Sequence, residues 1–290
     1  MRGVAPERTA HEVPAHHLLG LLEGAPDLET KVTRWREALH AARTAKGSKM
    51  PVLVVAHRGA SGSAPENTVA AFRLACRVPC DQVEFDLRHT RDGQWVVMHD
   101  EKVDRTTDGA GKVADLTLAQ IKRLDAGSWL APEFAGERVP TLTEALAAIP
   151  PQIGLNVHVK TVLPDTDAPE RELVQALADR KDRAAIYLMC DHELSVKRLQ
   201  ALDPDLPCGV FGGADWQAYL ERTAALGLTV IQPGREVLCP DLVLAAHRRG
   251  MRVNVFWADT PEDMREFIEM RVDGILTNQP AVLRRVLSDE

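Results

Sequence analysis

Five ionisable side chains lie within or directly after three short apolar runs in the first half of the chain. They are His57, Arg58, Glu84, Asp86 and His99. Apolar runs of this length are typical of buried strands, and α/β enzymes place their catalytic groups where such strands end. The stretch 52–100 therefore predicts part of an active site.

The two carboxylates predict a metal site. Glu84 and Asp86 are two residues apart and alternate with the apolar Val83 and Phe85, so both point to the same side of a strand. Carboxylates this close repel each other unless a proton or a cation lies between them, and a divalent metal ion with oxygen ligands satisfies both. A solvated pair at the edge of a sheet remains the alternative.

His57, His99 and Arg58 add groups that suit phosphate chemistry. Two imidazoles near a metal suit general acid–base catalysis because both titrate near neutral pH. The guanidinium group of Arg58 can hold a phosphate with two parallel hydrogen bonds. A structural histidine and a surface salt bridge of Arg58 are the competing interpretations.

Strand and helix patterns alternate from Pro51 onward and predict eight βα units. The predicted strands are 52–56, 82–88, 154–160, 185–190, 208–211, 229–232, 252–257 and 274–277. The predicted helices are 68–77, 142–149, 170–180, 193–202, 216–226, 240–249, 261–270 and 281–287. This number of units favours an α/β fold of the closed (β/α)8 TIM-barrel type over a doubly wound sheet.

Single residues mark several helix boundaries. Asp191, Asp215 and Thr260 are predicted N-caps, since short polar side chains accept hydrogen bonds from the first turn of a helix. Gly227 and Gly250 are predicted to end helices.

One connection is too long for a simple βα loop. Residues 88–141 form an insertion after the second strand, and Asp92-Gly93 within it predicts a hairpin turn. An insertion of this size is expected to build part of the substrate pocket. Its Trp129, Leu130 and Phe134 predict either an apolar wall of that pocket or the core of the insertion itself.

Residues 1–50 are predicted to be an N-terminal arm with a helical extension, and 51–290 the barrel domain. An amphipathic pattern over 28–42 indicates a surface helix. This helix packs on the barrel in one interpretation and forms a homodimer contact in the other.

Composition restricts the class of protein. The net charge of -7 argues against a general nucleic-acid partner. The longest apolar runs are strand-sized, so no membrane span is predicted, and residues 1–17 lack the apolar region of a signal peptide. Five cysteines in a chain of 290 residues suggest reduced thiols and a cytoplasmic location. Cys76 and Cys80 have no second Cys or His pair nearby, which argues against a zinc site there.

The ordered motifs carry a family resemblance. They are His57-Arg58-Gly59, Pro65-Glu66-Asn67-Thr68, Glu84-x-Asp86, Thr90-x-Asp92-Gly93, His99-Asp100, Lys160, Trp257 and the stretch from Asp273 to Asn278. Together they resemble the glycerophosphodiester phosphodiesterase family over about residues 52 to 288. The resemblance implies a TIM barrel with a small insertion after its second strand, and a divalent metal ion.

The resemblance also implies roles for individual residues. His57 and His99 would be the acid and base, and Arg58 and Lys160 would hold the phosphate. Glu66 would contact the substrate or the surroundings of the metal. Two residues that end predicted strands, Phe211 and Gln232, are weaker pocket candidates, and Trp257 packs either against the substrate alcohol or in the core.

One residue departs from the family pattern. His158 stands where the family places a third metal carboxylate, two residues before Lys160. His158 either ligates the metal together with Glu84 and Asp86, or contacts the substrate, or marks a lost metal site. The family resemblance implies calcium or magnesium, whereas an imidazole ligand would favour manganese, zinc or iron over calcium. Mg, Ca, Mn and Zn are therefore all candidates for the metal ion.

The function implied is metal-dependent hydrolysis of a small-molecule glycerophosphodiester to an alcohol and glycerol 3-phosphate, a step of lipid metabolism. A phosphodiesterase acting on a lysophospholipid or a sugar phosphodiester is one alternative. A barrel that binds a phosphate ligand without turning it over is the other, and the change at His158 is the feature that favours it.

Overall fold

Eight parallel strands form a nearly closed barrel in the computed structural model, which describes residues 52–163, 165–178, 180 and 185–288. The predicted arm and helical extension of residues 1–50 lie outside the described residues. The barrel strands are β1 Leu53–Ala56, β2 Gln82–His89, β4 Gly154–Val159, β5 Ile186–Cys190, β6 Cys208–Val210, β7 Val230–Ile231, β8 Arg252–Phe256 and β9 Gly274–Thr277. The TIM-barrel prediction is confirmed.

The order of the strands leaves one seam. Neighbours pair in the order β6-β5-β4-β2-β1-β9-β8-β7, so β6 and β7 stand at the two ends of the ladder of paired strands that the structure describes. The two short strands still approach each other across this seam.

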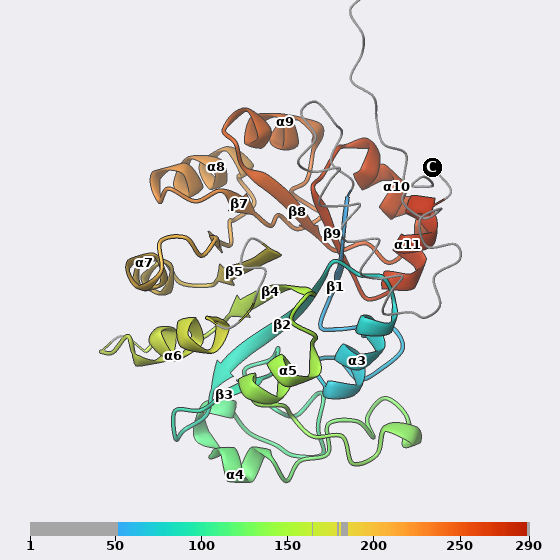
Figure 1. The fold of residues 1–290 in the computed structure, drawn as a ribbon, viewed down its shortest axis with the longest axis vertical. Helices are drawn as coiled ribbons and strands as arrows, with labels where there is room; N and C mark the ends of the chain where they lie inside the picture. Colours follow the sequence, from blue (N-terminus) through green and yellow to red (C-terminus); the bar gives the residue numbers. More distant parts are fainter. Residues whose placement is uncertain (1–51, 164, 179, 181–184, 289–290) are drawn as a thin grey trace, which may run out of the picture.

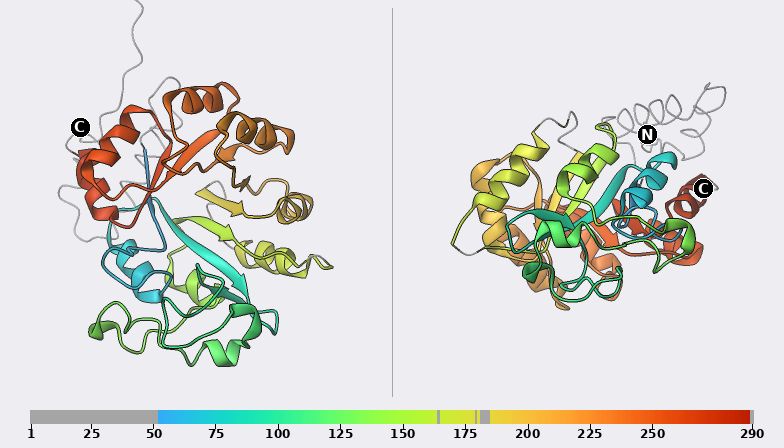
Figure 2. Two further views of the ribbon diagram at one scale, coloured as in Figure 1. Left: turned by 180° about the vertical axis from the view of Figure 1, so that it is seen from behind. Right: turned by 90° about the horizontal axis from the view of Figure 1, so that it is seen from below.

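Helices surround the barrel on its outer side (Figures 1 and 2). They are α3 Val69–Arg77, α5 Leu142–Ala148, α6 Ala168–Leu177, α7 Glu193–Leu202, α8 Trp216–Ala225, α9 Pro240–Arg248, α10 Pro261–Glu269 and α11 Pro280–Ser288. On β2, the apolar residues Val83, Phe85 and Leu87 belong to the core between strands and helices, where Phe85 packs against Phe72 of α3. The alternate residues of β2 therefore face the barrel interior.

The insertion forms a small subdomain with a core of its own. Its strand β3, Trp95–Val97, pairs antiparallel with the end of β2, and its helix α4 spans Leu118–Ile121. Two 3-10 turns, Val113–Asp115 and Pro132–Phe134, complete it. Its buried core residues are Val96, Met98, Val103, Val113, Ile121, Ala126 and Val139. The subdomain lies beside α3 and α5 (Figures 1 and 2) and holds the chain after β3 against the barrel mouth.

The predicted helix boundaries are largely confirmed. Asp215 and Thr260 cap α8 and α10 by accepting hydrogen bonds from backbone amides, and Gly227 and Gly250 follow α8 and α9 with positive φ. The N-cap prediction for Asp191 is wrong, because α7 begins after His192 and no side chain caps it. In the described part of the chain no helix is long and apolar enough to cross a membrane.

Gly59 supports a tight approach of the loop after β1 to α3. It has a φ of +83°, and a Cβ atom there would lie 2.7 Å from the carbonyl carbon of Ala71. Gly93 has a similar φ of +76°, but a Cβ atom there would meet nothing within 4 Å. The substitution Gly93→Ala therefore carries only the backbone strain, which makes it a matched control.

We predict that Gly59→Ala lowers the free energy of unfolding by about 2–4 kcal/mol, the sum of left-handed strain and a backbone clash. Gly93→Ala is expected to cost about 1 kcal/mol, because the strain acts alone. Urea unfolding followed by circular dichroism measures both. Equal losses in the two variants would contradict the close packing of Gly59 on α3.

Candidate active site

A cavity of about 210 Å³ opens at the carboxyl ends of the barrel strands. Its lining residues are His57, Arg58, Glu84, Asp86, His99, His158, Lys160, Asp191, Phe211, Gln232, Phe256 and Leu276. The polar residues of several strands, far apart in the sequence, are thus brought together at one site.

Glu84 and Asp86 form the buried acidic centre of this cavity. Their side chains are almost fully buried, and burial together with the charge of Asp86 raises the pKa of Glu84 to about 8. Burial would raise the pKa of Asp86 as well, yet the adjacent His158 ring and Lys160 ammonium group hold it well below its usual range. Asp86 is therefore ionised at neutral pH. Glu84 keeps its proton more readily, and a bound metal cation would favour the loss of that proton.

His158 lies between two carboxylates. Its Nδ1 is 3.0 Å from Oδ1 of Asp86, and its Nε2 is 2.8 Å from Oδ1 of Asp191. Burial opposes protonation of the ring, but the contacts with Asp191 and Asp86 outweigh it and raise the pKa of His158. The ring also packs against Phe211, with the ring centroids 4.5 Å apart.

The donor set fits a divalent cation. Glu84, Asp86 and His158 each offer one ligand atom, and these atoms all lie within 4.8 Å of one another. Oδ1 of Asp86 is buried beside His158 and Lys160 but accepts no hydrogen bond of good geometry from the described residues, so a lone pair remains that a bound cation would satisfy. Cys76 and Cys80 belong to no such group in the described chain.

Arg58 and Lys160 supply positive charge beside the carboxylates. The backbone N–H of Arg58 donates to Oε2 of Glu84 at 2.7 Å, and its Nη1 donates to Oε1 of Glu66 at 2.8 Å. Nζ of Lys160 lies 3.3 Å from Oδ1 of Asp86. Both side chains are largely buried, with 16% of Arg58 and 7% of Lys160 exposed, so the surface salt bridge considered for Arg58 does not describe its position.

The hydrogen bonds around His57 fix its tautomer. Nδ2 of Asn278 donates to Oδ2 of Asp259 at 2.6 Å, which directs Oδ1 of Asn278 toward Nδ1 of His57 at 2.8 Å. An amide oxygen only accepts, so Nδ1 carries the proton and Nε2 of the neutral ring is free to accept one. Burial and the positive charge of Arg58 lower the pKa of His57 to about 4, which keeps the ring neutral at pH 7.

His99 is held by a carboxylate instead. Its Nδ1 lies 2.6 Å from Oδ1 of Asp100, and Oδ2 of Asp100 accepts a hydrogen bond from Nε of Arg105 at 2.7 Å. Burial lowers the pKa of His99, while the carboxylates of Asp86 and Asp100 oppose that shift. A carboxylate at Nδ1 stabilises the protonated ring more than the amide at His57 does.

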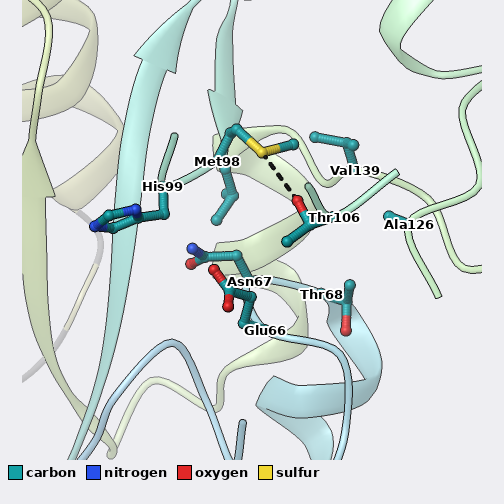
Figure 3. Close-up of a pocket in the computed structure, with 9 residues that line it drawn as sticks. Glu66, Asn67, Thr68, Met98, His99, Thr106, Ala126 and Val139 are labelled. Atoms are coloured by element: carbon teal, nitrogen blue, oxygen red, sulfur yellow. Dashed lines mark hydrogen bonds between the residues drawn. The ribbon is translucent and has the colours of Figure 1, made fainter. Parts of the chain in front are cut away.

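Glu66 links Arg58 to Arg105, the arginine that also holds Asp100 beside His99. Besides Arg58, it accepts hydrogen bonds of 2.7 and 2.8 Å from Arg105. Figure 3 shows Glu66 and Asn67 opposite His99 around a separate small cavity, where Thr106 donates to Sδ of Met98 at 3.4 Å. Glu66 does not line the larger cavity, so the structure places it as an anchor for the two arginines.

Trp257 lies at the rim. It stacks against His57 with ring centroids 6.2 Å apart, and its Nε1 donates to Oδ2 of Asp259 at 3.0 Å. With 42% of its surface exposed, it is not the core tryptophan of the alternative interpretation.

The sequence profile of the Glycerophosphoryl diester phosphodiesterase family matches residues 57–282. This match spans most of the described barrel. The chain belongs to the glycerophosphoryl diester phosphodiesterase family. Its relatives include a glycerophosphodiester phosphodiesterase of Caldanaerobacter subterraneus, 35% identical over 81% of this chain and 97% of that protein.

Solved structures of family members have the same fold. A phosphodiesterase of Oleispira antarctica in complex with the product sn-glycerol-3-phosphate is 28% identical, with a TM-score of 0.75, covering 83% of this chain and 98% of that chain. A glycerophosphodiester phosphodiesterase of Agrobacterium tumefaciens is 27% identical, with a TM-score of 0.69, covering 81% and 99%.

The sequence prediction of this family site missed four residues: Arg105, Asp191, Asp259 and Asn278. Asp191 directly follows strand β5, so its position at a strand end was a usable signal. Asn278 was recognised only as part of a motif, and nothing in the spacing of Asp259 indicated that it would orient Asn278. Gln232 lies at the cavity floor, where its Oε1 accepts a hydrogen bond from Nδ2 of Asn156 at 2.8 Å.

Proposed function

We propose that the protein hydrolyses glycerophosphodiesters to an alcohol and glycerol 3-phosphate, with a divalent metal ion in the site. The observation that carries this proposal is the placement of His57 and His99 in one cavity with Arg58, Lys160 and two buried carboxylates. A site that only binds phosphate needs no pair of imidazoles whose Nε2 atoms are left for proton transfer, with Nδ1 of each ring held by an acceptor.

The phosphate of the substrate binds at Arg58 and Lys160. The positions of both side chains beside Asp86 give them a fixed geometry. As negative charge builds on the phosphate oxygens in the transition state, these groups stabilise it without reorganising.

His57 acts as the general base. Its free Nε2 takes the proton from the attacking hydroxyl, which is that of water or of the neighbouring hydroxyl of the glycerol moiety. A new P–O bond forms as the P–O bond to the leaving alcohol breaks. A substrate hydroxyl as nucleophile gives a cyclic phosphate, which water then opens.

His99 acts as the general acid. Burial lowers the pKa of His99, but Asp100 holds Nδ1 of its ring and favours the protonated form. In that form, the proton on Nε2 passes to the leaving oxygen. The proton removed at His57 and the one delivered at His99 balance, and solvent exchange restores both histidines. Trp257 stacked on His57 keeps the ring in place.

Glu84, Asp86 and His158 would hold the metal ion. An ion bound there would supply Lewis-acid stabilisation of the negative charge on the phosphate oxygens. Asp191 fixes the orientation of His158 through its contact with Nε2, in the way that carboxylates commonly orient metal-binding histidines. This arrangement supports ligation by His158 over the other two interpretations.

The apolar wall that a lysophospholipid would need has less support. Trp129 and Leu130 are exposed on the insertion, but neither they nor Phe134 line the cavity. A role in lipid metabolism and a cytoplasmic location are further parts of the proposal, and five cysteines, an odd number in a chain of 290 residues, are typical of reduced thiols. A homodimer is also proposed, and light scattering of the purified protein tests it.

We predict that the purified protein releases glycerol 3-phosphate from glycerophosphoethanolamine in the presence of Mg, Ca, Mn or Zn. His57→Gln and His99→Gln are each expected to lower the rate by roughly 10²- to 10⁴-fold, the range of general acid–base catalysis. His247→Gln is the control, because His247 lies on α9 and pairs with Asp273. No release with any of the four metals, or full activity of both variants, would contradict the proposal.

We predict that the protein binds Mn²⁺ or Zn²⁺ more tightly than Ca²⁺, because one ligand is an imidazole. His158→Glu is expected to raise the affinity for Ca²⁺, and Asp191→Asn to weaken Mn²⁺ binding by about tenfold through loss of the oriented ring. Isothermal titration calorimetry measures each affinity directly. Unchanged Mn²⁺ binding in His158→Ala would reject His158 as a ligand.

A further inference from the structure

A second cavity adjoins the candidate active site over the seam of the barrel. It has a volume of about 360 Å³ and lies where the chain leaves β6, β7 and β8. Phe211, Gln232 and Phe256 line both this cavity and the catalytic one. A substrate whose phosphate lies at Arg58 and Lys160 can therefore extend into the second cavity.

The walls of this cavity are aromatic or made of backbone. Phe211 and Phe256 meet edge to face, with ring centroids 6.1 Å apart and an angle of 81°. The ring of Tyr219 lies against the Cα atom of Gly212, where a Cβ atom would overlap it. The hydroxyl of Tyr219 accepts a hydrogen bond of 3.0 Å from the backbone N–H of Gln232, which holds the ring in place.

One charged side chain lines the cavity, that of Glu236. Its carboxylate lies over the Cα atom of Gly234, which has no Cβ atom to displace it. The neighbouring Arg235 does not neutralise it directly, because both of its terminal nitrogens pair with Asp263, at 2.7 and 2.9 Å. In the part of the chain that the structure describes, no hydrogen bond or ion pair engages the carboxylate of Glu236.

We propose that this second cavity binds the leaving alcohol of the substrate and selects alcohols that carry a positively charged nitrogen. Aromatic faces attract cationic nitrogens through the charge distribution of the ring, and the carboxylate of Glu236 adds a full negative charge. The inference rests on the proposed function, which supplies the phosphodiester, and extends it from the reaction to the class of leaving group.

The neutral glycerol moiety fits this cavity less well. Glycerol hydroxyls could donate hydrogen bonds to the carboxylate of Glu236, but a neutral group gains no attraction from the net negative charge and little from the faces of the aromatic rings. A cationic group requires no directed acceptor, only negative potential and polarizable walls. Amine and quaternary ammonium groups share this chemistry.

The test compares kcat and KM of the full-length protein for three substrates. Glycerophosphocholine and glycerophosphoethanolamine carry cationic alcohols, and glycerophosphoglycerol carries a neutral one. Glu236→Gln is expected to raise KM for the two cationic substrates by about three- to tenfold, with kcat nearly unchanged. KM for the neutral substrate is expected to change by less than about twofold.

Two further variants sharpen the test. Glu236→Lys places a positive charge in the cavity and is expected to raise KM for the cationic substrates beyond the effect of Glu236→Gln. Glu221→Gln removes the same charge from an exposed position on α8 that does not line the cavity. It is expected to leave KM and kcat unchanged for all three substrates.

The possible failures are distinguishable. Equal effects of Glu236→Gln on all three substrates, or no effect on any, would overturn selection by charge while leaving the hydrolase intact. Absence of turnover of every diester by the unaltered protein would overturn the proposed function and this inference with it. If Glu236→Gln raised KM for glycerophosphocholine but not for glycerophosphoethanolamine, charge would also be rejected as the basis of selection.

Discussion

The site depends on two carboxylates that strand β2 forces together. Glu84 and Asp86 point to the same side of the strand, inside a barrel whose outer face is closed by Val83, Phe85 and the helices. Burial, together with the negative charge of Asp86, raises the pKa of Glu84 to about 8, so both carboxylates ionise together most readily when a cation lies between them. Arg58, His158 and Lys160 all lie close to this carboxylate pair.

The surrounding groups divide into two kinds. Arg58 and Lys160 lie within 3.5 Å of Asp86 and compensate its charge, and His158 lies 3.0 Å from it as the third donor of the proposed metal site. His57 and His99 stand farther out, each with Nδ1 held by an acceptor and Nε2 free. In the proposed mechanism, the first kind positions the phosphate and the metal ion, and the second moves protons. The two acceptors differ in charge, which separates the roles of the two histidines.

Much of the fold was predictable because each barrel strand has the apolar pattern of a buried strand and is followed by an amphipathic helix. The placement of Glu84 with Asp86, and of His158 with Lys160, followed from the two-residue period of a strand. The role of Asp191 did not follow, since an aspartate before a helix is also a good N-cap. The contact between Asp259 and Asn278 joins two separate loops, and the hydrophobic pattern contains no information about it.

The central claim is that Glu84, Asp86 and His158 hold one divalent ion. Anomalous diffraction from a crystal of the protein soaked in Mn²⁺ tests it most directly, because manganese scatters anomalously where protein atoms do not. The account predicts one strong peak bounded by these three side chains, with ligand distances of roughly 2.0–2.3 Å. No peak there, or a peak that His158 does not approach within roughly 3 Å, would contradict it.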